Sequence, residues 1–138
     1  MKISPQNLKF KKYHKPSIKL HKFNSNFKLR FGEIGLRSTS DSALTFAQIE
    51  SGRKALRRFL KKAGLLWVKV FPYSPLTKKP LSVRMGKGKG PINTWVCLTK
   101  TGQLIYELKG VSFGLAKHAI RSAVKKLPLN GRITEKSY

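Results

Sequence analysis

Apolar and polar positions alternate with a helical period in the centre of the chain. In "LTFAQIESGRKALRRFLKKAG", residues 44–64, apolar or small side chains recur every three or four positions, as on the buried side of an amphipathic helix. Thr45 is expected to cap the helix, since Gln48 three residues later completes a capping box. Gly64 is expected to end it. The predicted buried stripe comprises Ile49, Gly52, Leu56, Phe59, Leu60 and Ala63.

A second stretch, "SFGLAKHAIRSAVKKLP" at 112–128, has the same period and predicts a second helix that Pro128 ends. Its predicted buried side comprises Ala116, Ala119, Ile120, Ala123, Val124 and Leu127, while Lys117, Arg121 and Lys125 form a row of like charge.

Short apolar or β-branched runs predict strands elsewhere. "LLWVKVFP" at 65–72 and "LSVRM" at 81–85 flank the proline-rich "PYSPLTKKP", which is expected to be a loop. "NTWVCLTK" and "QLIYELK" are expected to form a hairpin through Thr101-Gly102. The pattern predicts an α+β fold, in which two helices pack on an antiparallel or mixed sheet of about four to six strands.

The net charge of the chain is the feature that most restricts its expected partners. The 138 residues carry 30 Lys and Arg against 5 Asp and Glu, a net charge of +25. A compact domain with this charge repels itself unless a polyanion neutralises it, so nucleic acid is the expected partner. An anionic membrane is the weaker alternative, and no apolar run approaches the ~20 residues of a membrane span. The outer side of the first helix carries like charges four residues apart, which predicts a phosphate-facing surface of Arg53, Lys54, Arg57, Arg58 and Lys61.

Residues 1–32 are expected to form an extended basic arm that becomes ordered against its partner, followed by a domain at 33–138. The arm contains nine Lys or Arg and no acid, with aromatic residues interleaved and no lasting periodicity. A cleavable presequence is the alternative, although such segments favour arginine and the first arginine here is Arg30.

The loop at 84–91 lies in "SVRMGKGKGP" and raises the question of a phosphate cradle. A Walker A loop needs Gly-Lys followed by Ser or Thr and a helix, but here Gly90 is followed by Pro91 and a predicted strand. A dinucleotide fingerprint fails as well, because its third glycine would fall at Pro91. The glycines and cations instead predict a flexible finger that approaches phosphates closely.

No constellation suited to catalysis or metal binding is evident. The five acidic residues are scattered, and the three histidines lack the spacing of metal ligands. Glu107 is expected at the surface, His118 on the polar side of the second helix, and Cys97 as a buried thiol. The sequence therefore predicts neither an enzyme nor a cofactor or metal site. A DNA-packaging or other general nucleic-acid-binding protein is the alternative function.

Several segments together resemble the bacterial-type large-subunit ribosomal protein sixteen family. They are "KFKKYHK", "FGEIGLRS", "LTFAQIESGRKALRR", "LLWVKVFP", "KPLSVRMGKGKGP", "WVCLTKTGQLIYELKGV" and "AVKKLPL", in order along nearly the whole chain. The chain departs from the family pattern at 16–28, where a glycine- and arginine-rich segment is expected, and the tail after Gly131 is hard to align.

The resemblance implies a hammerhead-like α+β fold and a structural role in the large ribosomal subunit. The implied partners are large-subunit ribosomal RNA near the aminoacyl-tRNA site, aminoacyl-site tRNA with peptidyl-site tRNA as a further candidate, and neighbouring ribosomal proteins. The implied roles are support of subunit assembly and tRNA positioning near the peptidyl transferase centre. Carried over by position, the ribosomal RNA contacts of the arm are Lys9, Lys11, Lys12, His14 and Lys15. The loop facing tRNA comprises Arg84, Met85, Gly86, Lys87, Gly88 and Lys89.

Lysine outnumbers arginine 22 to 8, which is typical of AT-rich coding. The start of the chain is in register with bacterial relatives, so no import extension is expected. Together with the divergent arm, these features predict an organelle-encoded protein of a mitochondrial ribosome. A bacterial cytoplasm or a plastid is the alternative location.

Overall fold

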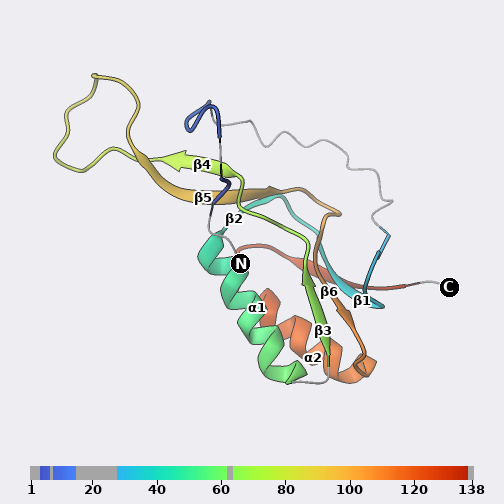
Figure 1. The fold of residues 1–138 in the computed structure, drawn as a ribbon. Coiled ribbons are helices and arrows are strands. Elements are labelled where there is room, and N and C mark those ends of the chain that lie inside the picture. The colour runs from blue at the N-terminus through green and yellow to red at the C-terminus, as the bar shows by residue number, and fades with distance from the viewer. Residues whose placement is uncertain (1–3, 7, 15–27, 62–63, 137–138) are drawn as a thin grey trace.

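A computed structural model describes residues 4–6, 8–14, 28–61 and 64–136. These residues form two helices and seven strands, which confirms the predicted α+β class (Figure 1). In chain order the elements are β1 (Ile34–Ser38), β2 (Ser42–Thr45), α1 (Phe46–Leu60), β3 (Leu65–Val68), β4 (Ser74–Thr77), β5 (Ile92–Thr99), β6 (Leu104–Lys109), α2 (Phe113–Val124) and β7 (Gly131–Glu135).

The strands form two antiparallel sheets, one in the order β3-β6-β1-β7 and the other in the order β2-β5-β4. The expected hairpin of β5 with β6 is wrong, because these strands belong to different sheets. Arg37 pairs with Leu104 and Ser42 pairs with Thr99. The two paired segments each advance by five residues between these pairs, so they stay in register from one sheet to the other. Gly102, with a φ of 88°, bends this ladder from one sheet into the other instead of reversing the chain.

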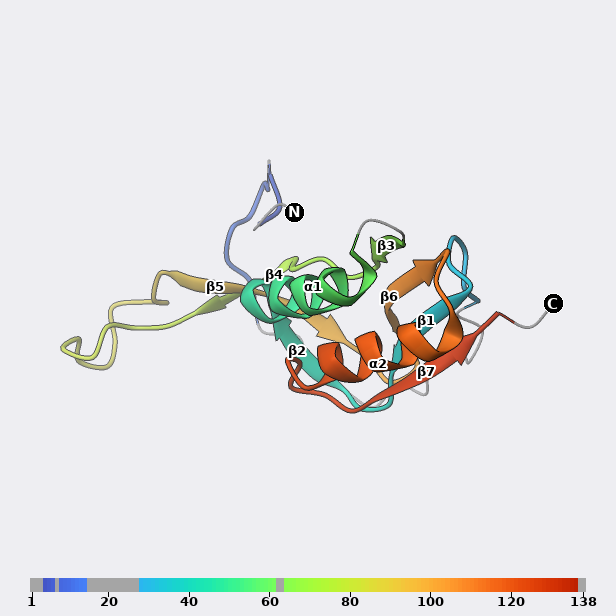
Figure 2. The same ribbon diagram turned by 90° about the horizontal axis from the view of Figure 1, so that it is seen from below.

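Both helices pack on one face of the four-stranded sheet and against each other (Figure 2). The core between them contains Leu36, Leu56, Tyr106 and Ile120, each with no more than 1% of its surface exposed. Burying each such side chain contributes about 1.5–3 kcal/mol, so the apolar stripes of the two helices stabilise this layer most. The second sheet extends beyond the helices and carries the loop between β4 and β5 (Figure 1).

Two strand assignments need correction. The proline-rich segment contains β4, whereas "LSVRM" is not a strand, and its Leu81 and Met85 are fully exposed. Pro75 is tolerated because β4 is the edge strand of its sheet, where a missing N–H breaks no further ladder. The residues of "LSVRM" have no strand beside them. Strands β1, β2 and β7 were not predicted at all.

The first helix starts as predicted but ends earlier. The Thr45 side chain accepts from the Gln48 N–H at 3.3 Å and the Gln48 side chain accepts from the Thr45 N–H at 2.9 Å, which confirms the capping box. The helix ends at Leu60, with Lys61 as its C-cap at a φ of 49°, so Gly64 is not the terminating residue. The buried stripe is confirmed for Ile49, Gly52, Leu56 and Leu60, whereas Phe59 is exposed and Ala63 lies outside the described residues.

The second helix ends at Val124, four residues before Pro128, and Ala116, Ala119, Ile120 and Ala123 are buried as expected. Leu127 is also buried, and Val124 is half-buried. His118 is exposed, as predicted. Cys97 is buried as expected, and this burial raises the pKa of its thiol.

Candidate nucleic-acid interface

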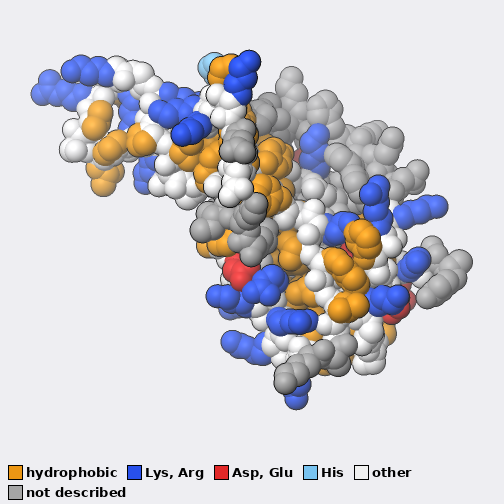
Figure 3. All heavy atoms as spheres, in the orientation of Figure 1, with side chains coloured by type: hydrophobic (Ala, Val, Ile, Leu, Met, Phe, Trp, Pro, Cys, Tyr) orange, Lys and Arg blue, Asp and Glu red, His pale blue; other side chains and the backbone are white. Residues whose placement is uncertain are grey.

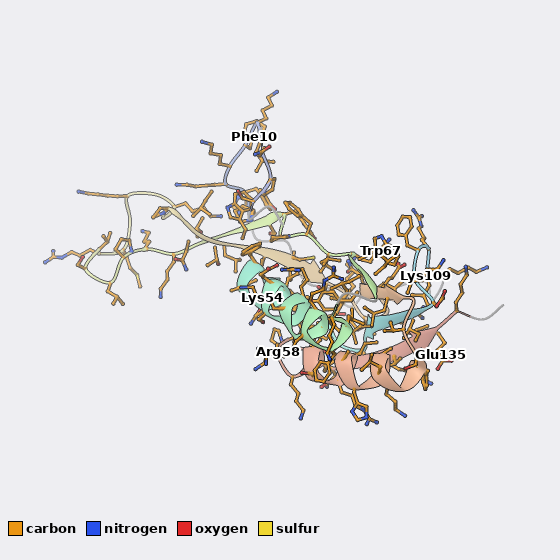
Figure 4. The ribbon with its side chains drawn as sticks, turned by 60° about the horizontal axis from the view of Figure 1, so that its bottom comes forward. Phe10, Lys54, Arg58, Trp67, Lys109 and Glu135 are labelled. Carbon is orange, nitrogen blue, oxygen red and sulfur yellow. The ribbon has the colours of Figure 1, made fainter. Side chains whose placement is uncertain are left out.

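The exposed side of α1 carries the predicted row of cations, and Figure 4 places Lys54 and Arg58 along the same side of the helix. Lys54, Arg58 and Lys61 are exposed, and their side chains make no hydrogen bond or ion pair with the described part of the chain. Lys54 and Arg58 are four residues apart, and like charges at this spacing destabilise a helix. A bound polyanion would remove this repulsion.

Two of the predicted cations on α1 already have partners. The Arg53 guanidinium forms two hydrogen bonds to the Glu50 carboxylate, at 2.9 and 2.7 Å, which lowers the pKa of Glu50. Arg57 Nη1 donates to the Gly64 carbonyl oxygen at 2.8 Å, beyond the end of the helix. Among the described residues, the predicted cations of this surface whose side chains have no hydrogen-bond or ion-pair partner are therefore Lys54 and Arg58 of α1 and Lys61 at its C-cap.

The loop between β4 and β5 projects from the body of the molecule (Figures 1 and 2). Its base is closed by a hydrogen bond from the Lys78 N–H to the Pro91 carbonyl oxygen at 3.1 Å. At its tip Gly86, Lys87 and Gly88 have φ angles of 97°, 52° and 82°. Such left-handed backbone favours glycine, so the glycines at the tip serve the turn itself.

Within this loop, close approach of another backbone segment to a glycine occurs at the base and not at the tip. A Cβ atom on Gly90 would lie 2.7 Å from the Lys78 carbonyl oxygen, whereas one on Gly86 or Gly88 would meet nothing within 4 Å. Arg84, Met85, Lys87 and Lys89 are exposed. Figure 3 shows Lys and Arg side chains gathered on this loop and, separately, over α1.

The described part of the arm lies against the base of the loop. Lys89 Nζ donates to the Tyr13 carbonyl oxygen at 2.7 Å, and Lys12 Nζ donates to the Lys89 carbonyl oxygen at 3.4 Å. The Tyr13 hydroxyl donates to the Tyr73 carbonyl oxygen at 3.4 Å. The structure thus brings together two residue sets that the sequence predicted separately.

Of the remaining predicted arm residues, three lie in the described part of the chain and one does not. Lys9, Lys11 and His14 are exposed, and the arm bends away from the body at Phe10 (Figure 4). Lys15 lies outside the described residues.

Glu107 corrects a further expectation, because it is completely buried on β6 and not at the surface. Its Oε2 accepts the N–H groups of Phe31 and Gly32 at 2.8 and 2.9 Å, and its Oε1 forms an ion pair with Lys69 Nζ at 3.4 Å. Burial alone would raise the pKa of Glu107, but the two N–H groups and Lys69 outweigh it and lower the pKa. Sequence reasoning missed this cluster, although a single acid within an apolar strand could have signalled it.

The described residues contain no cluster of three or more His, Cys, Asp or Glu that could hold a metal ion. None of the described helices is long and apolar enough to cross a membrane. The fold and the site define a strongly basic α+β protein that presents its cations on a helix and on a projecting loop.

Sequence comparison gives the family. Residues 5–134 match the family "Ribosomal protein L16p/L10e". The chain is 40% identical over 134 residues to "Large ribosomal subunit protein uL16" of Staphylococcus aureus strains Newman, JH1 and Mu3, which covers 97% of this chain and 92% of each relative. The chain therefore belongs to the ribosomal protein L16p/L10e family, and it is a ribosomal structural protein and not an enzyme. The family and these relatives support a structural role in the large ribosomal subunit.

Proposed function

We propose that this protein binds large-subunit ribosomal RNA near the aminoacyl-tRNA site, supports assembly of the subunit and helps to position tRNA near the peptidyl transferase centre. In this proposal the arm and α1 bind ribosomal RNA, the loop at 84–91 faces tRNA, and neighbouring ribosomal proteins complete the surroundings. Peptide bond formation is then RNA chemistry, and the protein organises the site.

The observation that carries the proposal is a group of exposed cations whose side chains have no partner in the described structure. Lys54, Arg58 and Lys61 have no internal partner among the described residues, although a net charge of +25 makes every such cation costly in the free protein. A phosphate backbone would neutralise them and release the counterions that it had condensed.

The loop supports a role distinct from that of α1. Its tip extends beyond the sheets (Figure 1), and Arg84 and Lys87 are exposed there, Lys87 on left-handed backbone. A narrow, cationic tip of this kind can enter a space between RNA strands that a helix cannot enter.

Sedimentation tests the proposal directly. The native chain should migrate with the large ribosomal subunit, and purified protein should bind large-subunit RNA in preference to duplex DNA at the same salt concentration. For about six to ten phosphate contacts, the affinity should fall about 10³–10⁵-fold between 50 and 200 mM salt. Equal affinity for DNA would favour a packaging protein, and a salt-insensitive complex would contradict the proposal.

The loop has its own test. Lys87→Ala should leave docking to ribosomal RNA mostly intact while slowing translation, and Lys89 is kept because its side chain also donates to the arm. Loss of subunit assembly in this variant would show that the loop is structural.

The compartment belongs to the proposal as well. The excess of lysine over arginine, 22 to 8, and the divergent segment at 16–28 support a mitochondrial ribosome and an organelle-encoded gene. Bacterial cytoplasm and plastid are the alternatives, and the relatives named above are bacterial. Location of the gene on a bacterial or nuclear chromosome would refute the mitochondrial assignment.

A further inference from the structure

The face of the four-stranded sheet opposite the helices carries a group of residues that none of the surfaces described above uses. On β3 the side chains of Leu66 and Val68 pack on the core, so Leu65 and Trp67 face the other way. Trp67 lies beside Glu107 in the ladder between β3 and β6. Figure 4 shows Trp67 at β3, on the far side of the molecule from the projecting loop.

Residues 28–32 cross this face and place a second aromatic ring on Trp67. Leu29 is buried, and its Cδ2 would lie 2.5 Å from a Cβ atom on Gly35 of β1, so the segment lies directly on the sheet. The Phe31 ring stacks on Trp67 with centroids 5.9 Å apart and an angle of 25° between the planes. Phe31 nevertheless keeps 55% of its surface exposed.

The Phe31 ring is held in place by the buried carboxylate and not only by apolar contact. The N–H groups of Phe31 and Gly32 both donate to Glu107 Oε2. Lys69 Nζ lies 4.6 Å from the centroid of the Phe31 ring and also pairs with Glu107. The exposed Phe31 ring, fixed in this way on the half-buried Trp67, is already ordered for binding, so a ligand would lose little conformational entropy in using it.

A cationic cavity adjoins the aromatic pair. It has a volume of about 190 Å³ and is lined by Lys28, Arg30, Lys69, Gln103 and Leu104. Three of these side chains are cations and none is acidic, so the cavity favours an anion. Lys69 links the two features, because it lines the cavity and also lies over the Phe31 ring.

We propose that the Phe31–Trp67 pair and the adjacent cavity bind one unpaired nucleotide of ribosomal RNA, with its base on the aromatic pair and its phosphate among Lys28, Arg30 and Lys69. The proposal rests on the ribosomal role proposed above and adds a third contact surface to residues 8–14 of the arm and to α1. The combination of a stacking ring with cations is what single-stranded RNA requires, since every base has an aromatic face and every phosphate a charge. A peptide segment without acidic side chains would leave the cations of the cavity without partners, and a base inside a duplex is already stacked on both faces.

Tryptophan fluorescence tests the stacking step. In a Trp95→Phe background Trp67 is the only tryptophan, because the chain contains two. Titration with single-stranded hexaadenylate should quench Trp67, whereas a hairpin duplex of equal phosphate number should not. Phe31→Leu should weaken hexaadenylate binding by about fivefold to a hundredfold, because it keeps an apolar side chain and removes the aromatic face. Phe31→Tyr should restore binding.

A matched control exists on the other side of the fold. Phe113 of α2 is also exposed, at 45%, and has Lys117 Nζ 5.8 Å from its ring centroid. Phe113→Leu should leave the quenching of Trp67 and the affinity for hexaadenylate unchanged. Equal weakening by Phe113→Leu and Phe31→Leu would overturn the proposal.

The phosphate step is tested by salt dependence. A plot of log affinity against log salt has a negative slope, and Lys28→Gln and Arg30→Gln should each reduce its steepness by about 0.7, the value for one phosphate contact on a single strand. Lys126→Gln, which removes an exposed charge after α2, is the control and should leave the salt dependence of hexaadenylate binding unchanged. Lys69 is left intact because it also contacts Glu107 and Phe31.

Failure of this inference can be distinguished from failure of the ribosomal role. If the wild-type chain enters the large subunit but Trp67 is not quenched by hexaadenylate, or is quenched equally by the duplex, the nucleotide subsite is wrong and the ribosomal role stands. A photo-crosslink from position 31 to a protein instead of RNA in the assembled subunit would also overturn it. If the chain does not enter the subunit at all, the proposed function itself falls.

Discussion

The Lys89 ammonium donates a 2.7 Å hydrogen bond to the Tyr13 carbonyl oxygen, 76 positions earlier in the chain. Lys12 donates in return to the Lys89 carbonyl oxygen, so the loop and the arm hold each other at this point. Lys87, two positions closer to the tip, makes no hydrogen bond with any described residue. The two lysines of the glycine-lysine loop therefore have different tasks.

Lys89→Ala should loosen the arm, because it removes one of the few contacts that hold residues 8–14 on the body. We expect faster hydrogen exchange and faster cleavage by a protease in this segment. Lys87→Ala is the matched control, since it removes the same charge from the same loop without a contact to the arm. If both variants expose the arm equally, charge and not the hydrogen bond governs its position.

Gly52→Ala should destabilise the protein although alanine is the better helix former by about 1 kcal/mol. A Cβ atom at position 52 would lie 2.5 Å from the Tyr106 hydroxyl oxygen, in a fully buried site. The hydroxyl cannot simply move away, because it donates to the Ile49 carbonyl oxygen at 2.7 Å. We expect the free energy of unfolding in urea to fall by about 1–3 kcal/mol.

Tyr106→Phe provides the test of that cause. The double variant Gly52→Ala with Tyr106→Phe should lose less stability than the two single variants added together, because the clashing hydroxyl is gone. Strict additivity would mean that the alanine destabilises the helix by another route.

The helices were predictable because their signals are local. The capping box at Thr45 and Gln48 and the stripe from Ile49 to Leu60 can be read from neighbouring positions, and the structure has both. The strand pairing was not predictable in this way. Thr101-Gly102 has the composition of a hairpin turn, but here β1 and β2 pair with the segments on either side of it, and the ladder bends instead of reversing.

In the candidate interface too, local features could be predicted from the sequence and contacts between distant residues could not. Cations on α1 could be found from spacing alone, but the partners of Arg53 and Arg57 depend on where Glu50 and Gly64 lie in space. Glu107 was expected at the surface because an isolated acid in a strand is usually exposed. Its burial depends on Phe31 and Gly32, which are about 75 positions away in sequence and supply the N–H groups.

Glu107→Gln should destabilise the protein near neutral pH by about 1.5–3 kcal/mol, since it weakens hydrogen bonds to a charged, buried group. The lowered pKa means that the native state favours the ionised carboxylate, so this contribution is complete above the ordinary pKa of 4.5 and is lost as the pH falls through the native-state pKa. Urea unfolding of both proteins between pH 3 and pH 7 (roughly the range over which carboxylates titrate) measures the difference. The difference should be constant at the upper end and shrink below about pH 4.5. A difference that grows on acidification would contradict the assignment.

Lys54→Gln and Arg58→Gln should move stability and RNA binding in opposite directions. Arg58→Gln relieves the repulsion between these two cations, which are four residues apart on α1, and should raise the free energy of unfolding by about 0.2–0.5 kcal/mol. Lys54→Gln relieves the same repulsion but also removes the attraction of Lys54 to Glu50, so its gain should be smaller. Each variant should also make the negative slope of log affinity for ribosomal RNA against log salt less steep by about 1. Arg53→Gln is the contrasting control, because its guanidinium is bound to Glu50 and its loss should reduce stability. If Lys54→Gln and Arg58→Gln leave the salt slope unchanged, α1 does not face phosphate, and the cations of this helix serve solubility alone.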